Sequence, residues 1–174
     1  MYEIKSSKKM YSGKIFDIYQ DEIELPNGNI ASRDSLIHNG AAAVLPIDEK
    51  GNIILVRQYR HSVLDYVLEI PAGKLEKDED PKVCAIRELE EEIGYISSDF
   101  SYMFKTYIAV GYSSEVIHIY LAKDLKKTVQ NLDDDEFLEI ETYTLDECMT
   151  MIQNGNILDS KTIATLLFYK QLIV

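Results

Sequence analysis

Residues 80–94 constrain the fold more than any other stretch, because both ends of a helix can be read from them. Asp80 is a residue type that caps helix N-termini, and Pro81 suits the first helical position. Gly94 is the residue type at which many helices end. The sequence therefore predicts a helix that starts at Pro81 and stops at Gly94.

The charges of this helix crowd onto one side. At about 100° per residue, Glu88, Glu91 and Glu92 gather in one patch, whereas Glu90 falls away from it. The apolar residues gather on the opposite side: Val83, Ile86, Leu89 and Ile93. Like charges three or four residues apart cost roughly 0.2–0.5 kcal/mol per pair. A solvated acidic face is one interpretation, and a site for a hard divalent cation is the other.

Two neighbouring features favour the cation site. The helix is preceded by the turn Pro71-Ala72-Gly73-Lys74, which can bring a backbone carbonyl toward the carboxylates. Arg87 lies where it can orient a neighbouring glutamate. Carboxylate and carbonyl oxygens are the ligands that such a cation prefers. A cation bound in this way keeps coordination positions for waters and for substrate phosphates.

The charge balance argues against some partners. The chain has 174 residues, with 18 Lys and Arg against 30 Asp and Glu, so its formal net charge is -12. A phosphate backbone would repel such a chain, so no nucleic-acid partner is expected. Cys84 and Cys148 match no metal or redox spacing and are expected to be reduced, packed thiols. Without an apolar signal segment or a run that could span a bilayer, a cytoplasmic protein with no membrane partner is expected.

The first third of the chain reads as strands. Residues 14–25 and about 29–38 alternate apolar and polar side chains around Pro26-Asn27-Gly28, which predicts a hairpin. Ala41–Ile47 is a continuous apolar run that ends at a turn, and Ile53–Arg60 follows it. These two segments are predicted to be paired strands of a more buried sheet.

The remainder mixes strands with helices. Further strand-like runs are found near residues 67–70, 102–109, 115–122 and 137–143. A capping box at Thr144–Glu147 begins a second helix that ends by Gly155, and a third helix begins near Asp159 or Ser160. Such a mixture, without a regular βαβ repeat, is typical of the α+β class or a mixed-sheet sandwich.

One motif is more specific than these patterns. Gly73, Glu79 and the run Arg87-Glu88-Leu89-Glu90-Glu91-Glu92-Ile93-Gly94-Tyr95 have the spacing of the box of the Nudix hydrolases. The chain therefore resembles that family, and only Tyr95 departs, at a position that is usually aliphatic. The resemblance implies a mixed-sheet α/β/α sandwich in which the box forms a loop, helix and loop.

The resemblance also implies a metal site. The metal would be Mg²⁺, with Mn²⁺ as a substitute, held by four groups: Glu88, Glu91, Glu92 and the carbonyl of Ala72. Arg87 and Glu91 would also be catalytic residues, with Arg87 as an orienting residue paired with Glu79 or Glu91. The chemistry agrees, because a highly charged diphosphate is hydrolysed with cations that neutralise its oxygens and acidify a bound water.

A wider resemblance covers nearly the whole chain. Residues 56–76 (VRQYRHSVLDYVLEIPAGKLE) and 111–122 (GYSSEVIHIYLA) resemble the ADP-ribose pyrophosphatase group, in which residues 1–39 would form a dimerising extension and 40–174 the catalytic domain. Val110 departs from that group, which usually has proline there. The expected reaction converts ADP-ribose to AMP and ribose 5-phosphate, and the expected assembly is a homodimer.

The resemblance and the strand pattern suggest substrate-binding residues. Arg57 and Arg60 point to opposite faces of a strand, so only one is expected to reach a phosphate, and the resemblance favours Arg60. Arg33 is a second candidate, which would act within the chain or across a dimer. Glu115 and Ser113 match a loop of the family that approaches the ribose phosphate or the metals.

The resemblance implies a general base from a late loop that closes over the substrate, and residues 132–136 are the late acidic loop of this chain. Glu136 is the first choice and Asp134 the second, against the alternative of a solvated turn. Three other functions stay open: hydrolysis of another nucleoside diphosphate sugar, action on a dinucleoside polyphosphate or RNA end, and nucleotide binding without catalysis.

Overall fold

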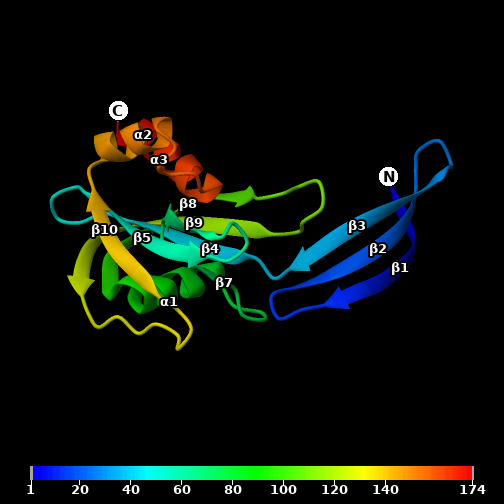
Figure 1. Cartoon of the computed structure of the whole chain (residues 1–174), viewed down its shortest axis with the longest axis horizontal. Coiled ribbons are helices and arrows are strands. Elements are labelled where there is room, and N and C mark those ends of the chain that lie inside the picture. The colour runs from blue at the N-terminus through cyan, green and yellow to red at the C-terminus, as the bar shows by residue number, and fades with distance from the viewer. Residues whose placement is uncertain (1, 174) are drawn as a thin grey trace. The chain divides into compact units, whose positions relative to one another are not determined.

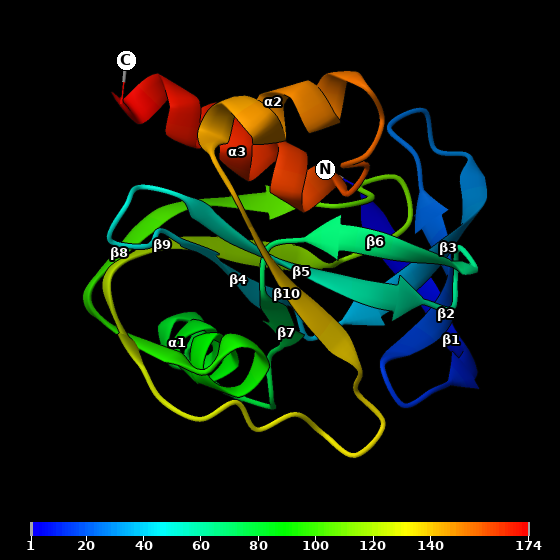
Figure 2. The ribbon, with the colours of Figure 1, turned by 60° about the vertical axis from the view of Figure 1, so that its left-hand side comes forward.

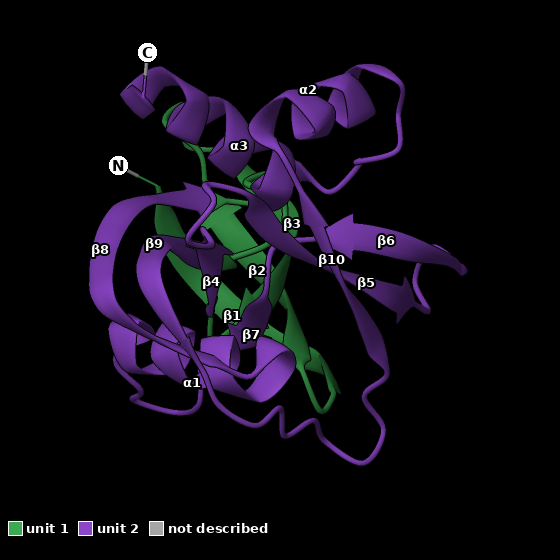
Figure 3. Cartoon of the chain, turned by 90° about the vertical axis from the view of Figure 1, so that its left-hand side faces the viewer, with its two compact units in different colours: residues 1–40, 107–116 green, residues 41–106, 117–174 purple. Residues whose placement is uncertain are grey.

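The structure, a computed structural model, describes residues 2–173. It contains two compact units (Figure 3). One unit combines the chain up to Gly40 with Tyr107–Val116, and the other combines Ala41–Thr106 with the chain from Ile117 onward. Each unit is described by itself below.

The smaller unit is built on one antiparallel sheet of three strands (Figure 1). The strands are β1 (Glu3–Ser12), β2 (Phe16–Glu24) and β3 (Ile30–His38), in the order β1-β2-β3. The hairpin of β2 and β3 confirms the prediction, and its turn is closed by hydrogen bonds from Leu25 N to Asn29 O and from Gly28 N to Leu25 O. The added strand β1, whose residues are all exposed, was not predicted.

The larger unit contains two sheets and three helices (Figure 2). Its strands are β4 (Ala41–Pro46), β5 (Ile53–Arg60), β6 (Asp65–Glu69), β7 (Ala72–Lys74), β8 (Tyr95–Tyr107), β9 (Val116–Lys127) and β10 (Leu138–Tyr143). Its helices are α1 (Pro81–Ile93), α2 (Leu145–Gln153) and α3 (Ser160–Ile173). The sheets run β7-β4-β9-β8 and β10-β5-β6, and the first is mixed because β4 and β9 are parallel.

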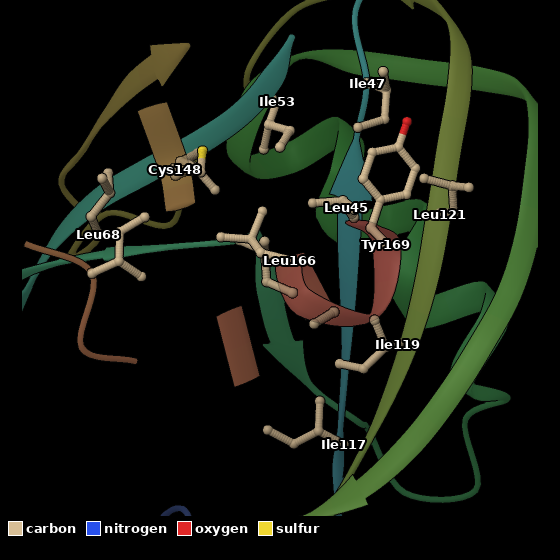
Figure 4. Close-up of a cluster of buried hydrophobic side chains, with 14 of the residues drawn as sticks. Leu45, Ile47, Ile53, Leu68, Ile117, Ile119, Leu121, Cys148, Leu166 and Tyr169 are labelled. Atoms are coloured by element: carbon tan, nitrogen blue, oxygen red, sulfur yellow. The ribbon is translucent and has the colours of Figure 1, made fainter. Parts of the chain in front are cut away.

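The core consists of two apolar layers on either side of these sheets. The first layer packs against α2 and α3, and it includes Leu45, Cys148 and Leu166 (Figure 4). The second layer packs against α1, and it includes Val44 and Leu89. Neighbouring residues of β4 and β5 alternate between the two layers, which explains why both strands read as continuous apolar runs. The α+β class and the predicted sandwich are therefore confirmed.

The predicted pairing of Ala41–Ile47 with Ile53–Arg60 is wrong. The turn reverses the chain through hydrogen bonds from Asp48 N to Asn52 O and from Gly51 N to Asp48 O. Beyond the bridge that joins Ile47 and Ile53, however, the two strands enter different sheets. The neighbours of β4 are β7 and β9, and those of β5 are β10 and β6, so both edges of each strand are already hydrogen bonded.

The helix ends agree with the sequence. Asp80 accepts a hydrogen bond from Lys82 N at the start of α1, and Gly94 ends the helix in the left-handed region with φ 67°. A capping box formed by Thr144 and Glu147 begins α2. Among residues 2–173, no helix is long and apolar enough to cross a membrane.

Candidate active site

The buried face of α1 only partly coincides with its apolar side. Of the four apolar residues that share one side, Leu89 and Ile93 are buried, but Val83 and Ile86 are 58% and 40% exposed. The helix instead turns Glu88 and Glu92 inward, together with the small side chains of Cys84 and Ala85, which allow it to lie close to β4 and β7. The helix therefore buries part of its acidic side.

A polar cleft of about 460 Å³ lies beside this face of α1. Its lining residues come from β5, the segment 72–76, the helix and the loop before β10: Gln58, Ala72, Gly73, Lys74, Glu76, Arg87, Glu88, Glu91, Glu92, Asn131, Asp133, Asp135 and Glu136. The loop passes next to α1 in Figures 2 and 3. The cleft thus brings together the predicted metal ligands, the orienting arginine and the first candidate for the base.

The segment before α1 fits closely around the glutamates. A Cβ atom added at Gly73 would lie 1.8 Å from Oε1 of Glu88, so a larger residue would collide with the carboxylate. Ala72 N donates a hydrogen bond of 3.2 Å to Oε2 of Glu92. The close approach of residue 73 to the side chain of Glu88 on α1 therefore requires glycine at position 73.

Arg87 is surrounded by carboxylates. Its guanidinium donates to Glu88 at 2.6 Å, to Glu91 at 2.8 Å and to Glu79 at 3.3 Å. Burial alone would lower the pKa of Arg87, but the hydrogen bonds to Glu79 and Glu91 raise it. Both partners considered from the sequence are present, and Glu88 is a third.

Arg87 alone does not neutralise the carboxylates of the cleft. Burial raises the pKa of Glu88 even though Arg87 opposes the change. Burial also raises the pKa of Glu92 well above its ordinary value, and the neighbouring Glu88 and Glu136 raise it further. A raised carboxyl pKa means that the ionised form lacks sufficient positive charge nearby, which a bound cation would supply.

The donor types fit a hard divalent cation. The cleft offers three helix carboxylates and the backbone of Ala72, all of which supply oxygen, and no thiolate or imidazole lines it. Over residues 2–173, no three His, Cys, Asp or Glu side chains are gathered in a metal-binding arrangement, and Arg87 is paired with Glu88 and Glu91. A cation held by these two carboxylates would replace Arg87 as their partner.

The loop before β10 is attached to the C-terminal part of α1. Gln130 Nε2 donates to the carbonyl of Glu92 at 2.6 Å, and Asn131 N donates to the carbonyl of Glu91 at 3.0 Å. Across the cleft, Gln58 Nε2 donates to Oε1 of Glu136 at 3.0 Å. Asp134, the second candidate for the base, is not among the residues that line the cleft.

Gln58 and Asn131 are cleft residues that sequence analysis missed. Gln58 could have been noticed, because it precedes Arg60 by two positions and strand side chains alternate. Asn131 carries no such signal, because its position depends on a backbone hydrogen bond between a loop and a distant helix.

The strand arginines have separate partners, as the alternation predicts. Arg57 pairs with Glu141 of β10. Arg60 donates through Nε and Nη2 to Glu69 at 2.6 and 2.9 Å and lines a second cavity rather than the acidic cleft.

The other predicted substrate residues belong to the smaller unit. Arg33 lies on β3 and donates to the carbonyl of Ser32. Ser113 is bridged to Leu36 of β3, and its hydroxyl accepts a hydrogen bond of 3.1 Å from Glu115 N. Within that unit, the loop and the hairpin are therefore joined.

Comparison with known proteins identifies the family. The profile of the NUDIX domain matches residues 37–166. The chain belongs to the Nudix family. It is 38% identical to an ADP-ribose pyrophosphatase of Bacillus subtilis (strain 168), over 90% of this chain and 86% of that protein. It is 41% identical to a methanol dehydrogenase activator of Bacillus methanolicus, over 94% and 90% of the two chains.

A solved structure titled as an ADP compounds hydrolase has the same fold, with a TM-score of 0.89. It is 22% identical and the match covers 99% of this chain and 94% of that one. The predicted Nudix fold and family are thus confirmed, and the protein is a Nudix hydrolase, a family that uses divalent metals.

Proposed function

We propose that this Nudix hydrolase cleaves the diphosphate bond of ADP-ribose and releases AMP and ribose 5-phosphate. The observation that carries the proposal is the acidic cleft, where buried Glu88 and Glu92 lie beside Ala72 with too little positive charge to balance them. The similarity to an ADP-ribose pyrophosphatase over 90% of the chain supports this choice among nucleoside diphosphate sugars.

The proposed cofactor is Mg²⁺, with Mn²⁺ as a substitute. Glu88, Glu91 and Glu92 would hold it together with the carbonyl of Ala72. When bound, it supplies neutralisation of the phosphate oxygens and a more acidic water. In its absence Arg87 is the counterion of Glu88 and Glu91, and it then serves to orient these carboxylates.

Glu136 is the proposed general base. It lines the cleft from a loop that is tied to α1, and its carboxylate accepts a hydrogen bond from Gln58. A carboxylate held in this way can take the proton of the attacking water. The amide of Gln58 keeps Glu136 directed across the cleft instead of into solvent.

The substrate contacts are proposed at four residues: Arg33, Arg60, Ser113 and Glu115. Arg60 lines a cavity of the catalytic domain, and Glu115 and Ser113 share one loop. We also propose that residues 1–39 form a homodimer through β1, whose exposed side chains include Ile4, Met10 and Tyr11. A cytoplasmic location agrees with the free, buried thiols of Cys84 and Cys148.

The proposal is tested by product analysis in water enriched with heavy oxygen. ADP-ribose, ADP-glucose, GDP-mannose and diadenosine polyphosphates are offered separately with Mg²⁺. We expect ADP-ribose to be cleaved fastest, and the label then identifies the phosphorus that water attacks. Glu92→Gln should be inactive, whereas Glu90→Gln, on the exposed side of the same helix, should retain activity.

Cleavage of another compound in preference to ADP-ribose would contradict the substrate assignment and leave the hydrolase assignment intact. Binding without cleavage of any compound would instead favour a nucleotide-binding module.

A further inference from the structure

Residues 128–137, named the base loop here, join β9 to β10 and contain Glu136 (Figure 2). Most of the loop is exposed. Its carboxylates at Asp133, Asp135 and Glu136 line the same cleft as the glutamates of α1. Like charges in one cleft repel, so electrostatics push the base loop away from the helix. Other contacts must therefore hold the loop at the cleft.

Hydrogen bonds to the end of α1 supply such contacts. Gln130 Nε2 donates to the carbonyl of Glu92 at 2.6 Å. Asn131 N donates to the carbonyl of Glu91 at 3.0 Å. Carbonyls in the last turn of a helix have no partner within the helix, so the loop satisfies them. The base loop is thus anchored to the same turn whose side chains are proposed as metal ligands.

Gly94 allows the loop and the helix to approach closely. Thr128 N donates to the carbonyl of Gly94 at 2.7 Å. A Cβ atom added at Gly94 would lie 2.9 Å from Gln130 N, which is closer than real Cβ atoms come to their neighbours. Gly94 therefore serves two purposes, because it adopts a positive φ of 67° and leaves room for Gln130.

The other end of the base loop is held by β10. Leu138 pairs there with Gln58 of β5, and Gln58 Nε2 donates to Oε1 of Glu136 at 3.0 Å. Between the two ends, a hydrogen bond from Glu136 N to the carbonyl of Asp133 closes a turn. Glu136 therefore lies on a short segment that is anchored to α1 on one side and to β5 on the other.

We propose that Gln130 is a positioning residue, which fixes the placement of Glu136 relative to the carboxylates of α1. Within the described chain, Gln130 is not among the residues that line the cleft, so it acts through Glu136 and not on the substrate. Its amide is the side-chain part of the anchor, whereas Asn131 and Thr128 contribute backbone groups. The inference rests on the proposed function, in which Glu136 is the general base.

The test uses Gln130→Met, which removes the donor and keeps a side chain of similar length. Gln130 is exposed, so the folded state should tolerate the change. Gln153→Met, at the exposed last residue of α2, is the matched control. Gly94→Asn disturbs the same contact independently, because asparagine tolerates the left-handed conformation but its Cβ would displace the loop at Gln130. Steady-state kinetics with ADP-ribose and Mg²⁺ measure kcat and KM.

Gln130→Met and Gly94→Asn should each lower kcat by about tenfold and change KM by less than about twofold, because catalytic groups are sensitive to small displacements. The control should leave both constants unchanged. In a Glu136→Gln background, Gln130→Met should lower kcat by less than about twofold, since a residue that acts through the base has little effect once the base is removed. Mg²⁺ should raise the melting temperature of Gln130→Met as it does that of the wild type, because the proposed ligands remain.

A wild-type kcat for Gln130→Met would overturn the proposal. Losses that multiply in the double variant, or a lost response of the melting temperature to Mg²⁺, would also overturn it, because Gln130 would then act on the fold or on the metal ligands. Failure of the proposed function has a different signature. Intact ADP-ribose with the wild-type protein, or a wild-type kcat for Glu136→Gln, would refute that function and, with it, the role of Gln130.

Discussion

Two glutamates of the larger unit are equally buried, but their pKa values shift in opposite directions. Glu69, at the end of β6, and Glu92, on α1, are each 3% exposed. Burial raises the pKa of Glu92 well above its ordinary value. Burial would do the same to Glu69, but Arg60 and Lys161 outweigh it and lower the pKa.

The difference lies in the neighbours rather than in the burial. Glu69 belongs to a cluster in which two cations, Arg60 and Lys161, face two carboxylates, the other being Asp159. Glu92 has a backbone N–H as its hydrogen-bond partner and faces further carboxylates. Removing one partner from a balanced buried cluster destabilises the fold, whereas an unbalanced cluster gains stability when a cation binds.

The largest effect is expected from Lys161→Met. The substitution leaves Glu69 buried with Arg60 as its remaining cationic partner, and breaking a buried pair costs about 3–5 kcal/mol in the free energy of unfolding. Urea denaturation measures the change. Lys170→Met, at an exposed position in the last turn of the same helix, should change the stability by less than about 0.5 kcal/mol. Equal losses for the two variants would show that Lys161 does not stabilise Glu69.

Glu136→Gln tests the catalytic role of the cleft that contains Glu92. The variant keeps the hydrogen-bonding shape but cannot accept a proton, so kcat should fall by about 100-fold while KM changes little. Steady-state kinetics with ADP-ribose measure both constants. Asp134→Asn serves as the control, and a larger loss of kcat in that variant would assign the base to Asp134.

The pH dependence of stability distinguishes Glu69 from Glu92, because their pKa values shift in opposite directions on folding. The pKa of Glu69 is lowered on folding, so its ion pairs contribute stability above the unfolded value near 4.5, and this contribution is lost as pH falls through the lower folded value. The stability difference between the wild type and Glu69→Gln should therefore shrink as the solution is acidified below pH 4.5. Thermal denaturation at a series of pH values measures it, and a difference that grows with acid would refute the assignment.

The sequence predicted best what depends on neighbouring residues. Asp80, Pro81 and Gly94 defined α1, and Thr144 with Glu147 defined the start of α2, because caps act within one turn. The family motif likewise lies within a short stretch, so the acidic cluster could be located before the fold was known.

Tertiary contacts explain what was missed. The pairing of β4 with β5 failed because the turn fixes the reversal of the chain but not the sheet that each strand joins. Leu89 and Ile93 of the apolar side of α1 are buried as their residue types suggest, but the burial of Glu88 and Glu92 was not foreseen because glutamates are ordinarily exposed. The pair of Lys161 and Glu69 joins positions 92 residues apart, which no local pattern reveals.

The most direct test of the account is the melting temperature of the metal-free protein, measured with and without Mg²⁺. At about ten times its Kd, Mg²⁺ should raise the melting temperature of the wild type by roughly 3–6 °C. Glu92→Gln should melt higher than the wild type without metal, because a buried carboxylate with too little counter-charge is removed, and should respond little to Mg²⁺. Glu90→Gln should respond like the wild type. A wild-type melting temperature unchanged by Mg²⁺, or equal responses of the two variants, would contradict the claim that these carboxylates form a cation site.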